Sequence, residues 1–253
     1  MMIKYFDIHT KEHSVRCKLF ANDPRSAKTA VVFGHGFAGH KDNRAAAGFA
    51  EALLSKKKDA LVLAFNWPAH GDDFKKKLTL ADCDRYLALV LEELTTKFAV
   101  EELYGYAVSF GAYLFLKYVS EHGDPFRKLA LRSPAVDMFG SLSGTIMSGD
   151  EAERVQKGKE VRVGFDRKVP VTRELLAALR ENDLRKRDFL DFADDLLILH
   201  GTADELVSFE ESRAFAEENL IEFIPVAGAD HRFHDPAHMA FANKAVLGFF
   251  GFS

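Results

Sequence analysis

Three residues, in the chain order serine, aspartate and histidine, have the types that nucleophilic catalysis requires. Ser109 lies where an apolar run meets an apolar helical pattern, Asp204 follows another apolar run, and His231 lies beyond a third. A serine hydroxyl becomes an effective nucleophile when an imidazole accepts its proton, and a carboxylate can fix the tautomer of that imidazole and stabilise its charged form. These three side chains could therefore cleave an acyl bond through a covalent intermediate.

The segment around Ser109 predicts a sharp turn between a strand and a helix. Leu103–Tyr113 passes from a strand pattern into the helix pattern of Phe110–Val119 with almost no loop, and Ala107 and Gly111 flank Ser109. A nucleophile on such a turn needs small neighbours, because the two backbones nearly touch there. Glycine is usual at both flanking positions, so Ala107 is a departure, and a buried structural serine is the alternative. A register with Ala107 as the central residue is rejected, since it would place Ser109 inside the helix.

The sequence also offers backbone donors for a developing negative charge. Val31–His40 is a strand pattern that ends in a His-Gly turn. The backbone N–H groups of Phe37, in this turn, and of Phe110, at the start of the helix, are the candidate oxyanion donors. Taken alone, the first segment would be interpreted as an ordinary glycine-rich turn.

The carboxyl half supplies the other two members of the set. Asp204 lies on a tight turn after the apolar run Leu196–His200, and Glu205 is the rival carboxylate with a less favourable offset from the strand end. His231 lies in the loop after Glu222–Val226. One helix and one strand separate the two residues, so both side chains return to the same end of a parallel sheet.

The other histidines show no pattern of metal ligands. We interpret His200 as a structural residue at a strand end, His70 as part of a turn near the site, and His234 and His238 as surface or loop groups. No pair has HExxH or another tight ligand spacing, so neither zinc nor any other cofactor is expected.

Strand-like runs alternate with helical patterns along the chain, and this alternation predicts the fold class. The runs are Ile3–Ile8, Val15–Phe20, Thr29–Phe33, Ala60–Phe65, Glu102–Ala107, Lys128–Arg132, Leu196–His200 and Glu222–Val226. The first two alternate in polarity and predict an antiparallel hairpin at a sheet edge, whereas the later runs are continuously apolar, as in parallel strands covered on both faces. We expect an α/β fold with a mainly parallel, doubly wound sheet.

Capping residues mark the starts of the helices. Thr79 precedes an amphipathic pattern over Leu80–Leu94, and Ser208 precedes Phe209–Asn219. Asp235–Pro236 supplies an N-cap and a first-turn proline for the last helix.

Residues 133–195 break the alternation. They are rich in charge, contain several glycines and hold one clear helix pattern, Thr172–Arg187. The stretch is too long for a simple crossover. We expect a single domain over residues 1–253 with a cap inserted at about 133–195, after the sixth strand. Candidate substrate-lining residues, which could instead form the core of the cap, are Met138, Phe139, Ile146 and Met147.

Composition narrows the class of protein further. The 253 residues are 47% hydrophobic with a formal net charge of −4, which suits one α/β domain and offers no basic stripe for nucleic acid. The start lacks the apolar stretch of a signal peptide, and no run is long enough to span a membrane. Cys17 and Cys83 match no metal-ligand spacing. We therefore expect a cytoplasmic protein without a disulfide framework, and neither nucleic acid nor a membrane as a partner.

Taken together, these motifs resemble those of the α/β-hydrolase superfamily over essentially the whole chain. The residues that carry the resemblance are HGF at 35–37, PAHGD at 68–72, AVSFG at 107–111, HGTADELV at 200–207 and GADHRF at 228–233. Within the superfamily the chain is most similar to compact bacterial serine esterases of the cinnamoyl/feruloyl type. The family roles that the resemblance implies are nucleophile for Ser109, general base for His231, orienting acid for Asp204 and oxyanion donors for Phe37 and Phe110.

The leading functional expectation is hydrolysis of a small-molecule carboxylic ester through an acyl-enzyme. Thioester or amide cleavage by the same triad stays open, as does a non-catalytic ligand-binding protein on the same fold. The sequence is compatible with a homodimer but does not specify the oligomeric state.

Overall fold

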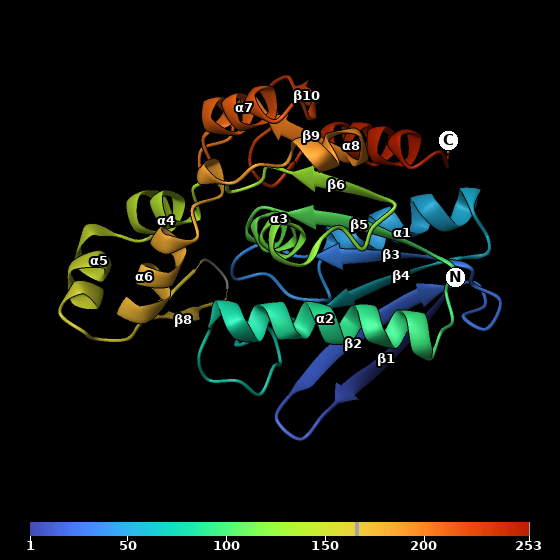
Figure 1. Ribbon diagram of the computed structural model, residues 1–253, viewed down its shortest axis with the longest axis horizontal. Helices are drawn as coiled ribbons and strands as arrows, with labels where there is room; N and C mark the ends of the chain where they lie inside the picture. The colour runs from blue at the N-terminus through green and yellow to red at the C-terminus, as the bar shows by residue number, and fades with distance from the viewer. Residues whose placement is uncertain (165–166, 253) are drawn as a thin grey trace.

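The centre of the computed structural model, which describes residues 1–164 and 167–252, is an eight-stranded sheet (Figure 1). Its strands, in sheet order, are β1 (Met2–His9), β2 (Ser14–Ala21), β4 (Ala60–Phe65), β3 (Thr29–Gly34), β5 (Glu102–Val108), β6 (Lys128–Arg132), β9 (Leu196–Gly201) and β10 (Glu222–Val226). β2 pairs antiparallel with both β1 and β4, and the other neighbours pair parallel. The predicted edge hairpin and mainly parallel sheet are confirmed.

Helices cover both faces of this sheet. The larger ones are α1 (Arg44–Lys56), α2 (Leu80–Thr96), α3 (Phe110–His122), α7 (Phe209–Glu218) and α8 (Pro236–Phe249). Side chains alternate along each strand, so β6 sends Leu129 and Leu131 into the core that contains α2, α3 and α7, and Ala130 into the core that contains α1 and α8. The sheet is therefore doubly wound, as the continuous apolar runs predicted.

The helix starts follow the capping residues of the sequence. The Thr79 hydroxyl accepts a hydrogen bond from the Asp82 backbone N–H, and the Ser208 hydroxyl accepts one from Glu211. The Asp235 carboxylate accepts one from Ala237 at the start of α8. Each cap satisfies a backbone donor that the helix itself leaves unpaired.

The stretch between β6 and β9 contains more regular structure than the sequence analysis expected. Its elements are α4 (Met138–Gly140), a π-helix (Ser141–Ile146), α5 (Gly149–Gln156), β7 (Val161–Val163), β8 (Val169–Val171), α6 (Arg173–Glu181) and two 3₁₀-helices (Leu184–Lys186, Leu190–Asp195). They lie beyond the carboxyl ends of the central parallel strands (Figure 1). The elements that were missed are short, and periodicity identifies short elements poorly.

The helix predicted over Thr172–Arg187 is also shorter than expected. Thr172 caps α6, but the helix ends at Glu181 because Asn182 leaves the helical conformation. The Asp183 carboxylate then accepts a hydrogen bond from the Arg185 backbone N–H and starts a separate 3₁₀ turn. A local side-chain cap therefore divides a stretch whose apolar pattern alone looks continuous.

The two cysteines form no disulfide. Cys17 and Cys83 are both buried as free thiols, and burial raises the pKa of each. Among the described residues, none of the helices combines the length and the apolar character that a membrane crossing requires.

Candidate active site

Ser109 occupies the turn between β5 and α3 in a strained backbone conformation. Its φ is 54° and its ψ is −119°, a region that residues with side chains rarely adopt. Its backbone N–H donates to the Arg132 carbonyl at 2.9 Å, and Phe110 is the first residue of α3. Ser109 thus lies ahead of the helix, on a strained turn of the kind that carries the nucleophile in a nucleophile elbow.

Close contact between β3 and α3 explains the small residues beside Ser109. A Cβ on Gly111 would lie 2.6 Å from the carbonyl oxygens of Gly34 and His35, too close for any side chain. Ala107 pairs with Gly34 across the sheet, and a Cβ on Gly34 would lie 3.2 Å from the Ala107 methyl group. The missing side chain of Gly34 therefore provides the room that Ala107 uses in place of the usual glycine.

His231 joins the other two residues of the predicted set. Its Nε2 lies 3.0 Å from Oγ of Ser109, and its Nδ1 lies 2.7 Å from Oδ2 of Asp204. All three residues are buried or nearly so. With Nδ1 protonated, the imidazole donates to the carboxylate and presents Nε2 as an acceptor to the serine hydroxyl. This is the arrangement that a general base needs in order to activate a serine.

Asp204 is held as a carboxylate by several donors. Burial alone would raise its pKa, but contacts with His200 and His231 and the backbone N–H of Val207 outweigh burial and hold the pKa far below the usual range. Its Oδ1 accepts from the N–H groups of Leu206 and Val207, each at 2.9 Å. The rival carboxylate, of Glu205, accepts instead from the His231 backbone N–H at 3.4 Å and leaves the imidazole to Asp204.

The two candidate oxyanion donors lie next to residues that touch the nucleophile. A Cβ on Gly36 would lie 3.2 Å from Cβ of Ser109, so the turn that carries Phe37 passes directly beside Ser109. Phe110 follows Ser109 and begins α3, where helix N–H groups lack intrahelical partners. The rings of Phe37 and Phe110 meet edge to face, with centroids 5.9 Å apart.

The ring of a buried histidine, His70, packs against the rings of both Phe37 and Phe110. The ring of His70 stacks on Phe110 at 6.0 Å and meets the edge of Phe37 at 5.8 Å. Its Nδ1 lies 2.9 Å from the Pro68 carbonyl. Burial lowers the pKa of His70 to about 4, so the imidazole is neutral near pH 7. The sequence located His70 near the site but did not reveal this stacking role.

The four apolar residues proposed to line a substrate pocket differ in burial. Met138 and Met147 are almost completely buried in the core, whereas Phe139 and Ile146 are partly exposed. The Arg180 guanidinium lies 4.3 Å from the centre of the Phe139 ring, and α4 packs against α6. The described contacts of these residues are with the insertion and the core beneath it.

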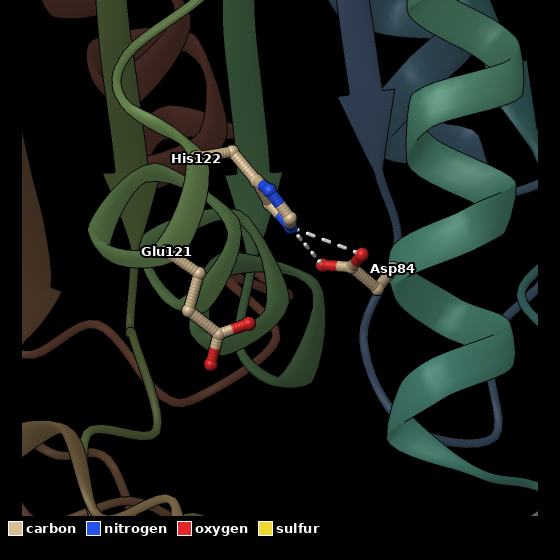
Figure 2. A group of neighbouring side chains, drawn as sticks. All are labelled: Asp84, Glu121 and His122. Atoms are coloured by element: carbon tan, nitrogen blue, oxygen red, sulfur yellow. Dashed lines mark hydrogen bonds and ion pairs between the residues drawn. The ribbon is translucent and has the colours of Figure 1, made fainter.

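A carboxylate–histidine cluster lies near the other end of α3. Asp84, Glu121 and His122 have potential ligand atoms within 4.8 Å of one another (Figure 2). His122 Nε2 lies 3.1 Å from both oxygens of Asp84, while Glu121 pairs with Lys117 at 2.5 Å and Arg187 at 2.9 Å. Since these cations already neutralise Glu121, we interpret the cluster as an ion-pair network.

The doubly wound sheet, the strained turn at Ser109 and the contacts of His231 define the α/β-hydrolase class. Residues 29–160 match the family model described as the alpha/beta hydrolase fold. This match spans more than half of the chain, and the protein belongs to the α/β-hydrolase family. No curated protein matches the sequence.

Solved structures share this fold over nearly the whole chain. Est1E from Butyrivibrio proteoclasticus with bound ferulic acid has a TM-score of 0.77 at 20% identity, and the match covers 97% of each chain. The monoacylglycerol lipase of Paleococcus ferrophilus has a TM-score of 0.71 at 21% identity, with 94% of this chain and 99% of that one covered. An esterase domain from Rhodothermus marinus has a TM-score of 0.70 at 16% identity, with 98% of each chain covered. At these identities the likeness establishes the fold.

Proposed function

We propose that this protein is a serine hydrolase that cleaves a carboxylic ester through an acyl-enzyme intermediate. The observation that carries the proposal is the position of His231, whose two ring nitrogens lie within hydrogen-bond distance of Ser109 and Asp204. This linkage supplies the nucleophile, the base and the group that orients the base in one buried network.

The reaction follows from the atoms that these residues present. Ser109 Oγ attacks the acyl carbon while His231 Nε2 takes the hydroxyl proton, and the N–H groups of Phe37 and Phe110 stabilise the resulting oxyanion. The tetrahedral intermediate collapses, and the departing alcohol receives the proton from His231. Water, deprotonated by His231, then attacks the acyl carbon, and the second tetrahedral intermediate collapses as His231 returns the proton to Oγ of Ser109 and the carboxylic acid leaves. Asp204 stays ionised throughout and stabilises the imidazolium.

An ester is the substrate class that the comparisons favour. One similar structure, of Est1E, contains bound ferulic acid. Two others are named as a monoacylglycerol lipase and as an esterase domain. The proposed partner is therefore a small-molecule ester, and the proposed mechanism uses no metal or other cofactor. Thioester or amide cleavage by the same triad and ligand binding without catalysis are alternative outcomes of the tests.

The insertion is proposed to act as the cap of a single domain. Its elements lie beyond the carboxyl ends of the parallel strands, the edge that also carries Ser109 and Asp204 (Figure 1). A Cβ on Gly164, which follows β7, would lie 2.8 Å from Cβ of Ala38, the residue after Phe37. The insertion therefore touches the proposed oxyanion loop. The cytoplasmic location and a homodimer stay predictions.

Ester turnover by purified protein tests the proposal. Wild type, Ser109→Ala and Ser133→Ala would be assayed with short-chain and aromatic nitrophenyl esters. Ser133 is a matched control, because it is a buried serine at the end of the adjacent strand β6 and also has a positive φ. We expect Ser109→Ala to lose roughly a million-fold in kcat with its fold intact, and Ser133→Ala to keep its activity. A wild type that is inert and also takes up no fluorophosphonate probe would favour ligand binding, and an equally active Ser109→Ala would reject the proposed nucleophile.

A further inference from the structure

A second imidazole contacts the carboxylate of the proposed triad. His200 is fully buried at the carboxyl end of β9, and its Nε2 lies 3.0 Å from Oδ2 of Asp204. The same oxygen lies 2.7 Å from Nδ1 of His231. Two imidazoles therefore approach one carboxylate oxygen, a relationship that the sequence analysis did not foresee when it interpreted His200 as a structural strand-end residue.

The surroundings of His200 leave Asp204 as its electrostatic partner. On α7 the Phe209 ring meets the imidazole edge to face at 5.7 Å, and β10 places Pro225 opposite His200 in the sheet. Within the described part of the chain, neither ring nitrogen of His200 makes a hydrogen bond of standard geometry, so its contact with Asp204 is a close electrostatic approach of Nε2 to Oδ2 at 3.0 Å. The nearby carboxylate is therefore the described group that can offset the desolvation of this buried imidazole.

The charged and titratable groups around this pair come from the site itself and from the neighbouring strand β6. The turn after β9 contributes Asp204 and Glu205, and the loop after β10 contributes His231, whose backbone N–H contacts Glu205. The elbow after β5 contributes the Ser109 hydroxyl. On β6, Arg132 pairs with Leu199, and its guanidinium lies over the Phe233 ring at 4.8 Å.

We propose that His200 is a positioning residue of the triad, which acts through Asp204 by holding Oδ2 and drawing negative charge away from the Asp204–His231 hydrogen bond. The inference rests on the proposed hydrolase function. It assigns a role in tuning the general base to a residue that does not touch the reacting atoms.

Charge balance at Asp204 determines the expected effect. Its Oδ1 accepts from two backbone N–H groups, and its Oδ2 faces His200 and His231. If His200 is removed, more negative charge on Oδ2 faces His231 and stabilises the protonated imidazole. A general base must be neutral to accept the serine proton, so the acidic limb of the kcat/KM profile moves to higher pH.

Three substitutions separate the donor from the bulk of the ring. His200→Leu removes the donor, His200→Gln keeps an N–H group at about the reach of Nε2, and His200→Asn is too short to present one there. We expect His200→Leu and His200→Asn to move the acidic limb upward by about 0.5–1 pH unit and to lower plateau kcat about tenfold, with KM little changed. His200→Gln should keep the limb near its wild-type position. If His200→Leu does not fold, the Gln and Asn variants carry the comparison.

Two outcomes would overturn the inference. One is an active wild type together with Leu and Asn variants whose kcat/KM profiles keep the acidic limb at the wild-type pH. That result would leave His200 a merely structural role. The other is an equal shift of the acidic limb in the Gln and Asn variants, which would show that the shift does not depend on an N–H donor at position 200. Failure of the proposed function looks different, because wild type itself would then neither turn over esters nor react with a fluorophosphonate probe.

Discussion

Oγ of Ser109 lies 3.0 Å from Nε2 of His231, although the two residues are 122 positions apart in the chain. Ser109 follows β5, and His231 lies in the loop after β10. The carboxyl ends of parallel strands meet at one edge of the sheet, so the fold brings these side chains together. The strained φ of Ser109 then directs its hydroxyl to the imidazole.

Replacing Asp204 by asparagine tests the tautomer of His231. Asparagine is nearly isosteric with aspartate, but its amide can donate to Nδ1, so the imidazole would present a protonated Nε2 to Ser109. We expect Asp204→Asn to retain the fold and to lose about 10⁴-fold in kcat. Steady-state kinetics, with circular dichroism as a check of folding, measures this. Glu205→Gln is the matched control, because the described hydrogen bond between Glu205 and His231 involves the His231 backbone N–H and not the imidazole. Equal losses in the two variants would contradict the assignment of Asp204.

The absence of a side chain at Gly111 allows α3 to pack closely against the end of β3. A methyl group on Gly111 would lie 2.6 Å from two backbone carbonyl oxygens, which cannot yield without opening the elbow. We expect Gly111→Ala to lower the free energy of unfolding by about 2–4 kcal/mol and to abolish turnover. Urea unfolding and ester kinetics measure the two effects.

Gly48→Ala provides the control for that experiment. Gly48 lies within α1, and a Cβ there would have open space around it. Alanine is favoured over glycine inside a helix by about 1 kcal/mol, so this variant should be more stable and fully active. A Gly111→Ala protein as stable and active as wild type would show that the contact between α3 and β3 is looser than described.

Acid sensitivity of the fold should depend partly on His70. Its pKa is about 4 in the folded protein and about 6.5 in the unfolded chain, so between these values the unfolded chain binds more protons. The free energy of unfolding must therefore fall as the pH decreases through that window. We expect His70 to contribute about 2 kcal/mol of the loss between pH 7 and pH 5.

Comparison with a variant isolates this contribution. His70→Gln does not titrate, so its stability should fall by about 2 kcal/mol less than that of wild type between pH 7 and pH 5. Titrating groups that do not contact His70 are common to both proteins and cancel in the difference. Chemical unfolding at the two pH values provides the measurement, and parallel pH dependences would reject the assigned pKa.

The proposed substrate lining predicts a change in acyl preference. Phe139 is partly exposed on α4, so Phe139→Ala should alter the ratio of kcat/KM for aromatic and acetyl esters by about tenfold. Met138→Ala should alter the ratio as well and also destabilise the fold by about 2–4 kcal/mol, because Met138 is only 2% exposed. Leu179→Ala, in the buried face of α6, should destabilise without changing preference. An unchanged preference in both of the first two variants would remove these residues from the proposed pocket.

The sequence predicted the sheet well because its strands are short apolar runs bounded by turns. The same runs placed Ser109, Asp204 and His231 at strand ends, and parallel pairing then required a common edge. Two features of the site depend instead on contacts between distant segments. The room for Ala107 comes from Gly34 on the neighbouring strand, and the contact of His200 with Asp204 depends on side-chain directions at a turn. Neither feature has a local sequence pattern.

Covalent labelling of the nucleophile tests the central claim most directly. A fluorophosphonate reacts only with an activated serine, and peptide mass spectrometry identifies the labelled residue. The account predicts one adduct, on Ser109, that is lost in Ser109→Ala and forms far more slowly in Asp204→Asn. Folded wild-type protein that takes up no label, or that takes it up on a different serine, would contradict the account.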